Sequence, residues 1–221
     1  MPNAKPTIRI DIVSDVVCPW CIVGYKQLEP AMDALREKAD FELHWHPFEL
    51  NHDMPDEGQD LAEHISEKYG SSKEDSAANR KRLSDLGDSL GFRFDYFDGM
   101  RMVNTYKAHQ LLHWAREQGR EHDLKLALFK AYFSDRKDVN NADVLADAAA
   151  SVGLDRDEAL AVLLDGRYAD AVRQEEVQWI QRGIQAVPAV VLNEKYLVSG
   201  AQGTENYTQV LSEVLKESAS A

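Results

Sequence analysis

Two cysteines set three positions apart are the residues of this chain whose types and spacing are most informative about chemistry. Cys18 and Cys21 enclose Pro19 and Trp20, and the sequence contains no other cysteine. The residues before them, 7–13, alternate apolar and polar side chains and predict a strand, whereas apolar residues recur at helical spacing after the pair. The pair therefore lies where a strand gives way to a helix, a context in which C-x-x-C indicates redox chemistry.

The predicted position of the pair gives its two sulfur atoms different roles. At a helix N-terminus, unpaired backbone amides and the positive end of the helix dipole stabilise a thiolate on Cys18 over the thiol. Cys21 lies one turn further on, within reach of a mixed disulfide formed on Cys18, and we expect its sulfur to be the more buried. The sequence predicts that Cys18 is the nucleophile and Cys21 the resolving cysteine.

A zinc site is the alternative chemistry for two neighbouring cysteines. Zinc needs two further ligands, and the candidates are His109 with His113, spaced as H-x3-H, or His44 with His46, on one face of a predicted strand. Structural zinc motifs usually hold their ligand pairs closer in sequence than these. We favour redox chemistry and predict no metal, while a zinc-holding binding module stays open as an alternative.

The helix after the cysteines and the strand that follows it each contain a proline. Pro30 removes a backbone donor, so we expect the helix to kink or divide near residue 29. Residues 41–50 alternate again and predict a second strand, in which Pro47 indicates a sheet edge, a bulge or the end of the strand.

A long helical block, a hairpin and a last helix make up the rest of the chain. Helical periodicity extends from about residue 58 to 182, and the clearest helices are predicted at 103–119, 123–133, 142–153 and 157–164. After it come a predicted hairpin (189–192 and 196–199), a helix (about 204–215) and a polar tail (217–221) that we expect to fray. Two strands before the block and two after it should pair into one sheet of about four strands. This order predicts an α/β fold in which helices interrupt a small sheet domain.

Several segments together resemble a known family. The family-like segments are SDVVCPWC (14–21) and GIQAVPAVVLNEKYLVSGAQ (183–202), with FELNHDMPDEGQD, NTYKAHQLLHWA and LFKAYFSD between them. They are similar to the DsbA-type thiol-disulfide oxidoreductases of the thioredoxin superfamily, most closely the FrnE-like branch. The resemblance implies a thioredoxin-like domain, residues 1–57 and 183–221, with a large all-helical insertion domain, residues 58–182.

The resemblance also implies further site residues. Pro188 corresponds to the family's cis-proline opposite the cysteines, and Val187 before it would offer backbone groups to a bound substrate. The segment around Asn104 and His109 resembles one whose helix borders the active cleft, where an imidazole that titrates near neutral pH would help proton transfer. A histidine that is merely packed or solvated is the alternative for His109.

Pro19 and Trp20 form the active-site loop in this reading. Trp20 replaces the histidine of strongly oxidising periplasmic relatives and so removes a cationic neighbour that favours the thiolate. We therefore expect a weaker oxidant, with a potential between roughly −270 mV, as in thioredoxin, and about −120 mV.

The predicted function is disulfide exchange, as an oxidoreductase or isomerase, with protein or small-thiol substrates. The resemblance requires no bound cofactor beyond the redox-active disulfide, and glutathione is a candidate co-substrate. A rival within the superfamily is a glutathione-dependent enzyme similar to kappa-class transferases and 2-hydroxychromene-2-carboxylate isomerases. Those enzymes share the helical insertion but usually carry serine where Cys18 stands.

The composition and charge of the chain exclude some classes of binding partner. The 25 Lys and Arg against 38 Asp and Glu give a net charge of −13, which repels nucleic acids and anionic membrane surfaces. No apolar run approaches the roughly 18 residues of a membrane span, so we expect a cytoplasmic protein without nucleic-acid or membrane partners, and either a monomer or a homodimer. We assign the aromatic residues at helix or strand spacing to the core: Trp45, Phe48, Trp114, Tyr132, Phe133 and Trp179.

Overall fold

A four-stranded sheet joins the two ends of the sequence in the computed structural model, which describes residues 5–218. Its strands are β1 (Thr7–Ser14), β2 (Asp40–Pro47), β5 (Ala189–Leu192) and β6 (Tyr196–Ser199), in the order β2-β1-β5-β6. The prediction of one sheet built from two strands on either side of the helical block is confirmed.

Strand pairing places β1 at the centre of the sheet. β1 runs parallel to β2, from Thr7 opposite Asp40 to Ser14 opposite Pro47, and antiparallel to β5. β5 and β6 form the predicted hairpin. Pro47 is the last residue of an edge strand, as its missing amide led us to expect.

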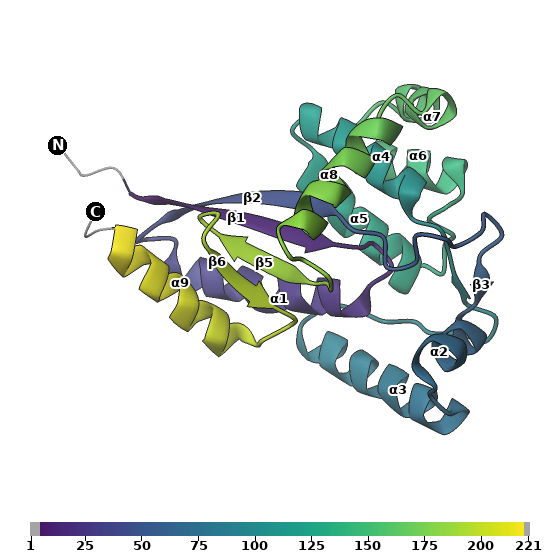
Figure 1. The fold of residues 1–221 in the computed structure, drawn as a ribbon, viewed down its shortest axis with the longest axis horizontal. Helices are drawn as coiled ribbons and strands as arrows, with labels where there is room; N and C mark the ends of the chain where they lie inside the picture. The colour runs from purple at the N-terminus through teal and green to yellow at the C-terminus, as the bar shows by residue number, and fades with distance from the viewer. Residues whose placement is uncertain (1–4, 219–221) are drawn as a thin grey trace.

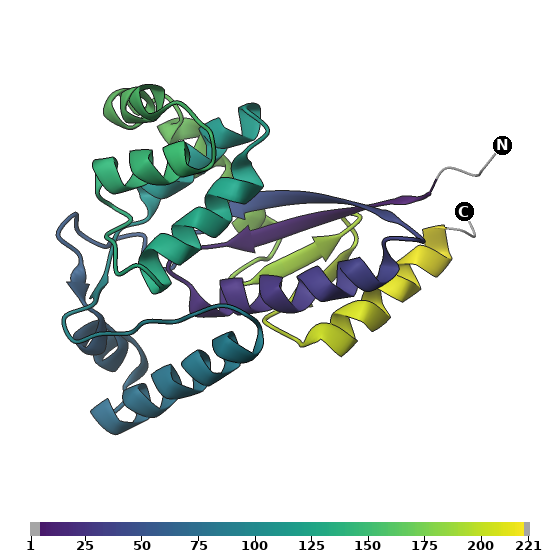
Figure 2. The ribbon, with the colours of Figure 1, turned by 180° about the vertical axis from the view of Figure 1, so that it is seen from behind.

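Helices cover both faces of the sheet. Helices α1 (Pro19–Leu35) and α9 (Thr204–Ser218) pack side by side on one face, and α8 (Ala169–Gln181) lies over the other, as the two opposite views in Figures 1 and 2 show. Under α8, the buried Trp179 packs with Val13 and Ala189 of the sheet. The strand ends that lead to the cysteines are thereby held between helices.

Two helices differ from the predictions in one detail each. α1 continues through Pro30 as one helix rather than dividing, and Pro30 is exposed, so the carbonyl group that loses its donor lies on the solvent side. α9 continues to Ser218 because Glu217 is held by Tyr196 and by Lys195 at 3.2 Å, so the predicted fraying is wrong for 217 and 218. The remainder of that tail, 219–221, lies outside the described residues.

The block between β2 and β5 is helical, as predicted, with one addition. Its helices are α2 (Leu61–Tyr69), α3 (Lys73–Ser89), α4 (Tyr106–Glu117), α5 (Glu121–Phe133), α6 (Ala142–Ser151), α7 (Arg156–Asp165) and α8. The addition is a pair of two-residue antiparallel strands, β3 (Gln59–Asp60) and β4 (Arg101–Met102). In both views α2 and α3 lie on the opposite side of the strand ends from α4, α6 and α7.

One hydrophobic core cluster extends from the sheet into this block. It includes Ile10 and Ile12 of β1, Leu28 of α1, and Leu111 and Leu128 of α4 and α5, all essentially inaccessible to solvent. Within residues 5–218, no helix combines the length and the apolar character that crossing a membrane requires. The division into domains at residues 57 and 183 stays a prediction.

Candidate active site

The two cysteines stand at the first turn of α1. Cys18 is the N-cap residue, with extended backbone angles (φ −88°, ψ 111°), and Pro19 is the first helical residue. The Cys18 amide donates to the Asp15 carbonyl at 3.3 Å, and the Cys21 amide donates to the Cys18 carbonyl at 3.1 Å. Both cysteines are free and buried.

The two thiols differ in their surroundings. Cys18 is 3% exposed and lines a cavity, whereas Cys21 is fully buried and is not among the residues lining that cavity. Burial and the adjacent Cys18 sulfur raise the pKa of the Cys21 thiol well above its ordinary value. A substrate entering the cavity therefore meets Cys18 first, and Cys21 lies behind it.

The loop before β5 lies next to Cys18. The Val187–Pro188 peptide bond is cis, the geometry that the resemblance implied. The Cys18 thiol donates to the Val187 carbonyl at 3.9 Å. Pro188 also packs closely against α1, since a Cβ atom at Gly24 would lie 3.3 Å from Cγ of Pro188, closer than an ordinary van der Waals contact.

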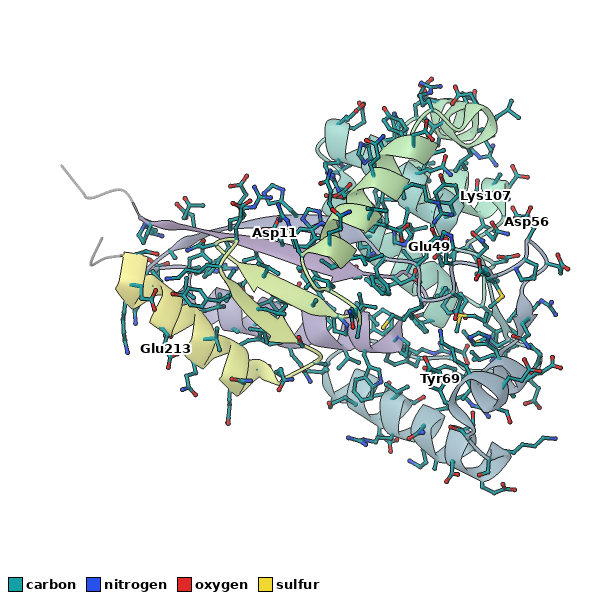
Figure 3. All side chains as sticks on the ribbon, viewed as in Figure 1. Asp11, Glu49, Asp56, Tyr69, Lys107 and Glu213 are labelled. Atoms are coloured by element: carbon teal, nitrogen blue, oxygen red, sulfur yellow. The ribbon has the colours of Figure 1, made fainter. Side chains whose placement is uncertain are left out.

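The cavity beside Cys18 has a volume of about 430 Å³. Apolar and aromatic side chains form most of its wall: Val17, Leu50, Leu61, Ile65, Leu83, Met100, Met102 and, from the end of α5, Tyr132 and Phe133. Tyr69, the last residue of α2 and labelled in Figure 3, is 60% exposed and also contributes. The assignment of Tyr132 and Phe133 to the core alone is therefore incomplete, since they pack inward and also border this cavity.

A buried carboxylate lies just before the cysteines. Asp15 accepts a hydrogen bond from the Leu50 amide at 2.8 Å, and its other oxygen lies 3.3 Å from Nε2 of His109 on α4. Burial alone would raise the pKa of Asp15, but the contacts with His109, the Leu50 amide and the charge of Lys125 together outweigh it and lower that pKa. His109 thus contacts the segment just before Cys18 through Asp15 and does not line the cavity.

A lysine is buried beneath the cysteines. Lys125 on α5 is 1% exposed, and its Nζ donates to the Ser14 carbonyl at 3.3 Å. The rings of Trp45 and Phe129 hold the ammonium group at 5.4 and 5.3 Å from their centroids. Burial lowers the pKa of Lys125 to about 8, against the opposing negative charges of Cys21 and Asp15. This side chain can therefore exchange a proton near neutral pH.

A comparison with known protein families finds one that covers almost the whole chain. Residues 9–212 match the family described as "DSBA-like thioredoxin domain". The chain belongs to this family.

Individual relatives of this DSBA-like thioredoxin domain cover nearly its whole length. The crystal structure of a protein described as a "probable DsbA oxidoreductase" from Streptomyces coelicolor, SCO1869, is 35% identical, with a TM-score of 0.90, over 95% of this chain and 91% of that one. YwbO from Bacillus subtilis, described as uncharacterized, is 26% identical over 96% of this chain and 99% of its own length. The cytosolic disulfide reductase DsbM from Pseudomonas aeruginosa, solved with GSH, shares the fold with a TM-score of 0.65 at 16% identity, over 94% of this chain and 99% of that one.

Asn104 lies outside the cavity lining of this DSBA-like domain. Its amide donates to the Met54 carbonyl at 2.8 Å, and its side-chain oxygen accepts from the Tyr106 amide at 2.9 Å. These bonds shape the turn that leads into α4. Asn104 therefore does not border the cavity, contrary to our hypothesis. Its side chain instead makes hydrogen bonds with nearby backbone groups.

The histidines that were candidate zinc ligands have other partners. His46 lies between Asp11 at 2.8 Å and Glu175 at 2.6 Å, and His113 lies 3.4 Å from Glu175. His44 lies 3.2 Å from a glutamate on its own strand. The structure does not bring these side chains to the cysteines.

One other cluster has the residue types of a metal site. Among the described residues, the ligand atoms of Glu49, His52 and Glu176 lie within 4.8 Å of one another, and neither cysteine belongs to the group. Glu49 is labelled in Figure 3. Nη1 of Arg173 contacts all three, at 2.7 Å from His52, at 3.1 Å from Glu176 and in a closer contact with Glu49. The positive charge of the Arg173 guanidinium therefore already balances the carboxylates of this cluster.

Proposed function

We propose that the chain is a thiol-disulfide oxidoreductase in which Cys18 attacks the substrate disulfide and Cys21 resolves the intermediate. One observation carries the proposal. Cys18 stands at a helix N-terminus, touches the Val187 carbonyl and lines the cavity, while Cys21 is buried directly behind it. Substrate reaches one thiol and not the other, as sequential attack and resolution require.

The reaction transfers two electrons in two steps. The Cys18 thiolate attacks one sulfur of a disulfide, forms a mixed disulfide and releases the first substrate thiolate. Cys21 then loses its proton and attacks the Cys18 sulfur, which forms the Cys18–Cys21 disulfide and releases the second substrate thiolate. The substrate is reduced and the protein oxidised, and the reverse sequence oxidises a dithiol.

Other groups near the site are proposed to support this sequence. Lys125 is the candidate base for Cys21, because it is buried beneath the cysteines and its pKa lies at about 8. The backbone of Val187, next to Pro188, is proposed to hold an extended segment of substrate. No bound cofactor beyond the cysteine pair is needed, and glutathione remains a candidate co-substrate. A cytoplasmic location stays a prediction, as does the choice between monomer and homodimer.

Two cysteine variants test the assignment of roles. Cys18→Ser should abolish exchange with a model disulfide, because the thiol that lines the cavity is lost. Cys21→Ser should retain the first step and accumulate a mixed disulfide on Cys18, seen as added mass in the intact protein. A Cys21→Ser protein that turns over normally would refute the resolving role.

A redox titration of the wild-type protein in glutathione buffers tests the couple itself. Alkylation and intact mass should show a two-electron transition, with about 30 mV for each tenfold change in the equilibrium constant. A stable glutathione adduct on Cys18, without the internal disulfide, would instead support the glutathione-dependent transferase or isomerase alternative. A pair that resists oxidation and retains bound zinc would support the binding module.

A further inference from the structure

The charges around the cavity beside Cys18 are unlike those of the chain as a whole. The protein carries a net charge of −13, yet the only charged side chains among the described residues that line this cavity are Arg80 and Arg82. No Asp or Glu contributes to its wall. Two positive charges and no negative one therefore lie around the cavity that Cys18 lines.

Both arginines come from α3 and are oriented by neutral groups. The Arg82 guanidinium lies 6.0 Å from the ring centroid of Trp20, the residue just before Cys21. Arg80 is half-buried and donates to Oγ of Ser76 at 3.3 Å. Its charge also acts on the phenol of Tyr96, another residue of the wall.

Neither guanidinium has a carboxylate partner among the described residues, whereas most arginines of that part of the chain have one. Arg93, four residues after the end of α3, pairs with Asp95 at 2.9 Å, and Arg136 pairs with the same carboxylate at 2.9 Å. Because a planar guanidinium matches a carboxylate with two parallel hydrogen bonds, Arg80 and Arg82 retain that capacity for a ligand.

We propose that this cavity selects low-molecular-weight disulfides that carry carboxylate groups, with Arg80 and Arg82 as the anion-binding residues. The inference rests on the proposed function and deepens it. A volume of about 430 Å³ lies within the range of roughly 300–1,000 Å³ that is typical of small-molecule sites. The apolar wall packs against the body of the ligand, and the arginines orient it so that its disulfide meets Cys18.

The chemistry at the sulfur atoms is the exchange already described. A symmetric acidic disulfide takes two electrons from the cysteine pair and leaves as two thiols, which also carry away the two protons of Cys18 and Cys21. The arginines take no part in bond making. They raise the rate by binding the carboxylates and by favouring the approach of an anion.

Single-turnover oxidation of the reduced protein tests the proposal. Three disulfides differ in charge: oxidised glutathione is anionic, bis(2-hydroxyethyl) disulfide is neutral and cystamine is cationic. Each is mixed in excess with wild type, with the double variant Arg80→Gln/Arg82→Gln and with the control Arg93→Gln, which changes an arginine outside the cavity wall. The ratio of wild-type to variant rate constants for one disulfide cancels the intrinsic reactivity of that disulfide.

The double variant should react about tenfold more slowly with oxidised glutathione, as expected for the loss of charge-assisted hydrogen bonds. It should change less than twofold with the neutral disulfide and react faster with cystamine, while Arg93→Gln follows wild type throughout. S-methylglutathione, which has the carboxylates but no exchangeable sulfur, should slow the wild type and not the double variant. Because Arg82 is exposed, Arg82→Gln alone provides a second test if the double variant does not fold.

Failure of this inference differs from failure of the proposed function. Equal rates for wild type and double variant with oxidised glutathione, or an equal loss with all three disulfides, overturn the anion site while exchange through Cys18 stands. A wild-type protein that forms no Cys18–Cys21 disulfide with any of the three overturns the proposed function itself. A polypeptide disulfide of the same net charge that reacts faster than oxidised glutathione overturns the selection of small molecules.

Discussion

Replacing Lys125 with methionine should slow resolution by Cys21 and leave the attack by Cys18 unchanged. Methionine preserves an unbranched side chain between the rings of Trp45 and Phe129 but cannot accept a proton. Cys21 must lose its proton to attack, and its pKa is raised by burial. Lys125 is the buried group that can accept that proton near neutral pH.

The pKa of Lys125, about 8, sets the expected magnitude and pH dependence. About a tenth of the Lys125 side chains are deprotonated at pH 7 and about half at pH 8, so resolution in the wild type should speed up about fivefold over that interval and then level off. General base catalysis contributes roughly 10²–10⁴-fold, and we expect the lower end, a loss of about 100-fold at pH 7. In the variant, the rate should rise about tenfold per pH unit, because ionisation of Cys21 then depends on solvent alone.

A chromogenic disulfide separates the two steps in one experiment. 5,5′-Dithiobis(2-nitrobenzoate) releases one coloured thiolate when Cys18 attacks and a second when Cys21 resolves the mixed disulfide. Stopped-flow traces should show an unchanged fast phase and a slower second phase in Lys125→Met. Lys130→Met is the matched control, since Lys130 lies on the same helix but is exposed and paired with Asp135 at 2.6 Å. A second phase that is unchanged, or a fast phase slowed by the same factor, would refute the role of Lys125.

Three further substitutions test contacts away from the cysteines. Burial opposes the charge of His46, yet its carboxylate partners outweigh burial and raise its pKa, so these contacts stabilise the fold below about pH 6.5 and are lost as the pH rises through the raised pKa. Glu175→Gln should lower the His46 pKa in an NMR titration and flatten the fall in unfolding free energy between pH 6 and 8; an unmoved titration would contradict this. Asn141→Ala removes the side-chain cap of α6 and should cost about 1 kcal/mol in urea unfolding, whereas Asn141→Asp should cost little; equal losses would argue against capping. Gly58→Ala should cost at least about 2 kcal/mol, because φ is +66° and the added Cβ would lie 2.4 Å from the Met102 carbonyl oxygen; a smaller loss would mean that the β3–β4 pair shifts easily.

The fold was largely predictable because its elements carry strong local patterns. Strands at 189–192 and 196–199 were predicted to the residue, since short, mostly apolar runs there flank a short polar turn. The cysteine position was also predictable, because Pro19 suits the first helical position. The division of the helix at Pro30 was a wrong prediction, because the cost of a proline in a helix depends on whether the freed carbonyl is exposed, and the sequence pattern does not show exposure. The two-residue strands β3 and β4 are too short for any periodicity.

The polar groups beneath the cysteines could not be predicted in the same way. Lys125 occupies a helix that alternates charged and apolar residues, where a lysine normally faces solvent, and only the packing of α5 against β2 shows that it is buried. Asp15 was visible next to the motif, but its partner His109 lies 94 residues away. Tyr132 and Phe133 have the spacing of core residues, and spacing cannot distinguish a core position from one that also borders a cavity.

The order of strands in the sheet has a consequence for synthesis of the chain. The central strand β1 pairs on one side with β2, which is made soon afterwards, and on the other with β5, whose first residue is 189. At roughly 5–20 residues per second, the 142 residues from 47 to 189 take about 7–30 s, during which the open edge of β1 is available to other nascent strands. We therefore expect ribosome-bound chains stalled before residue 189 to depend on chaperones and to be cleaved by protease near β1. Chains stalled well beyond β6 should resist cleavage there.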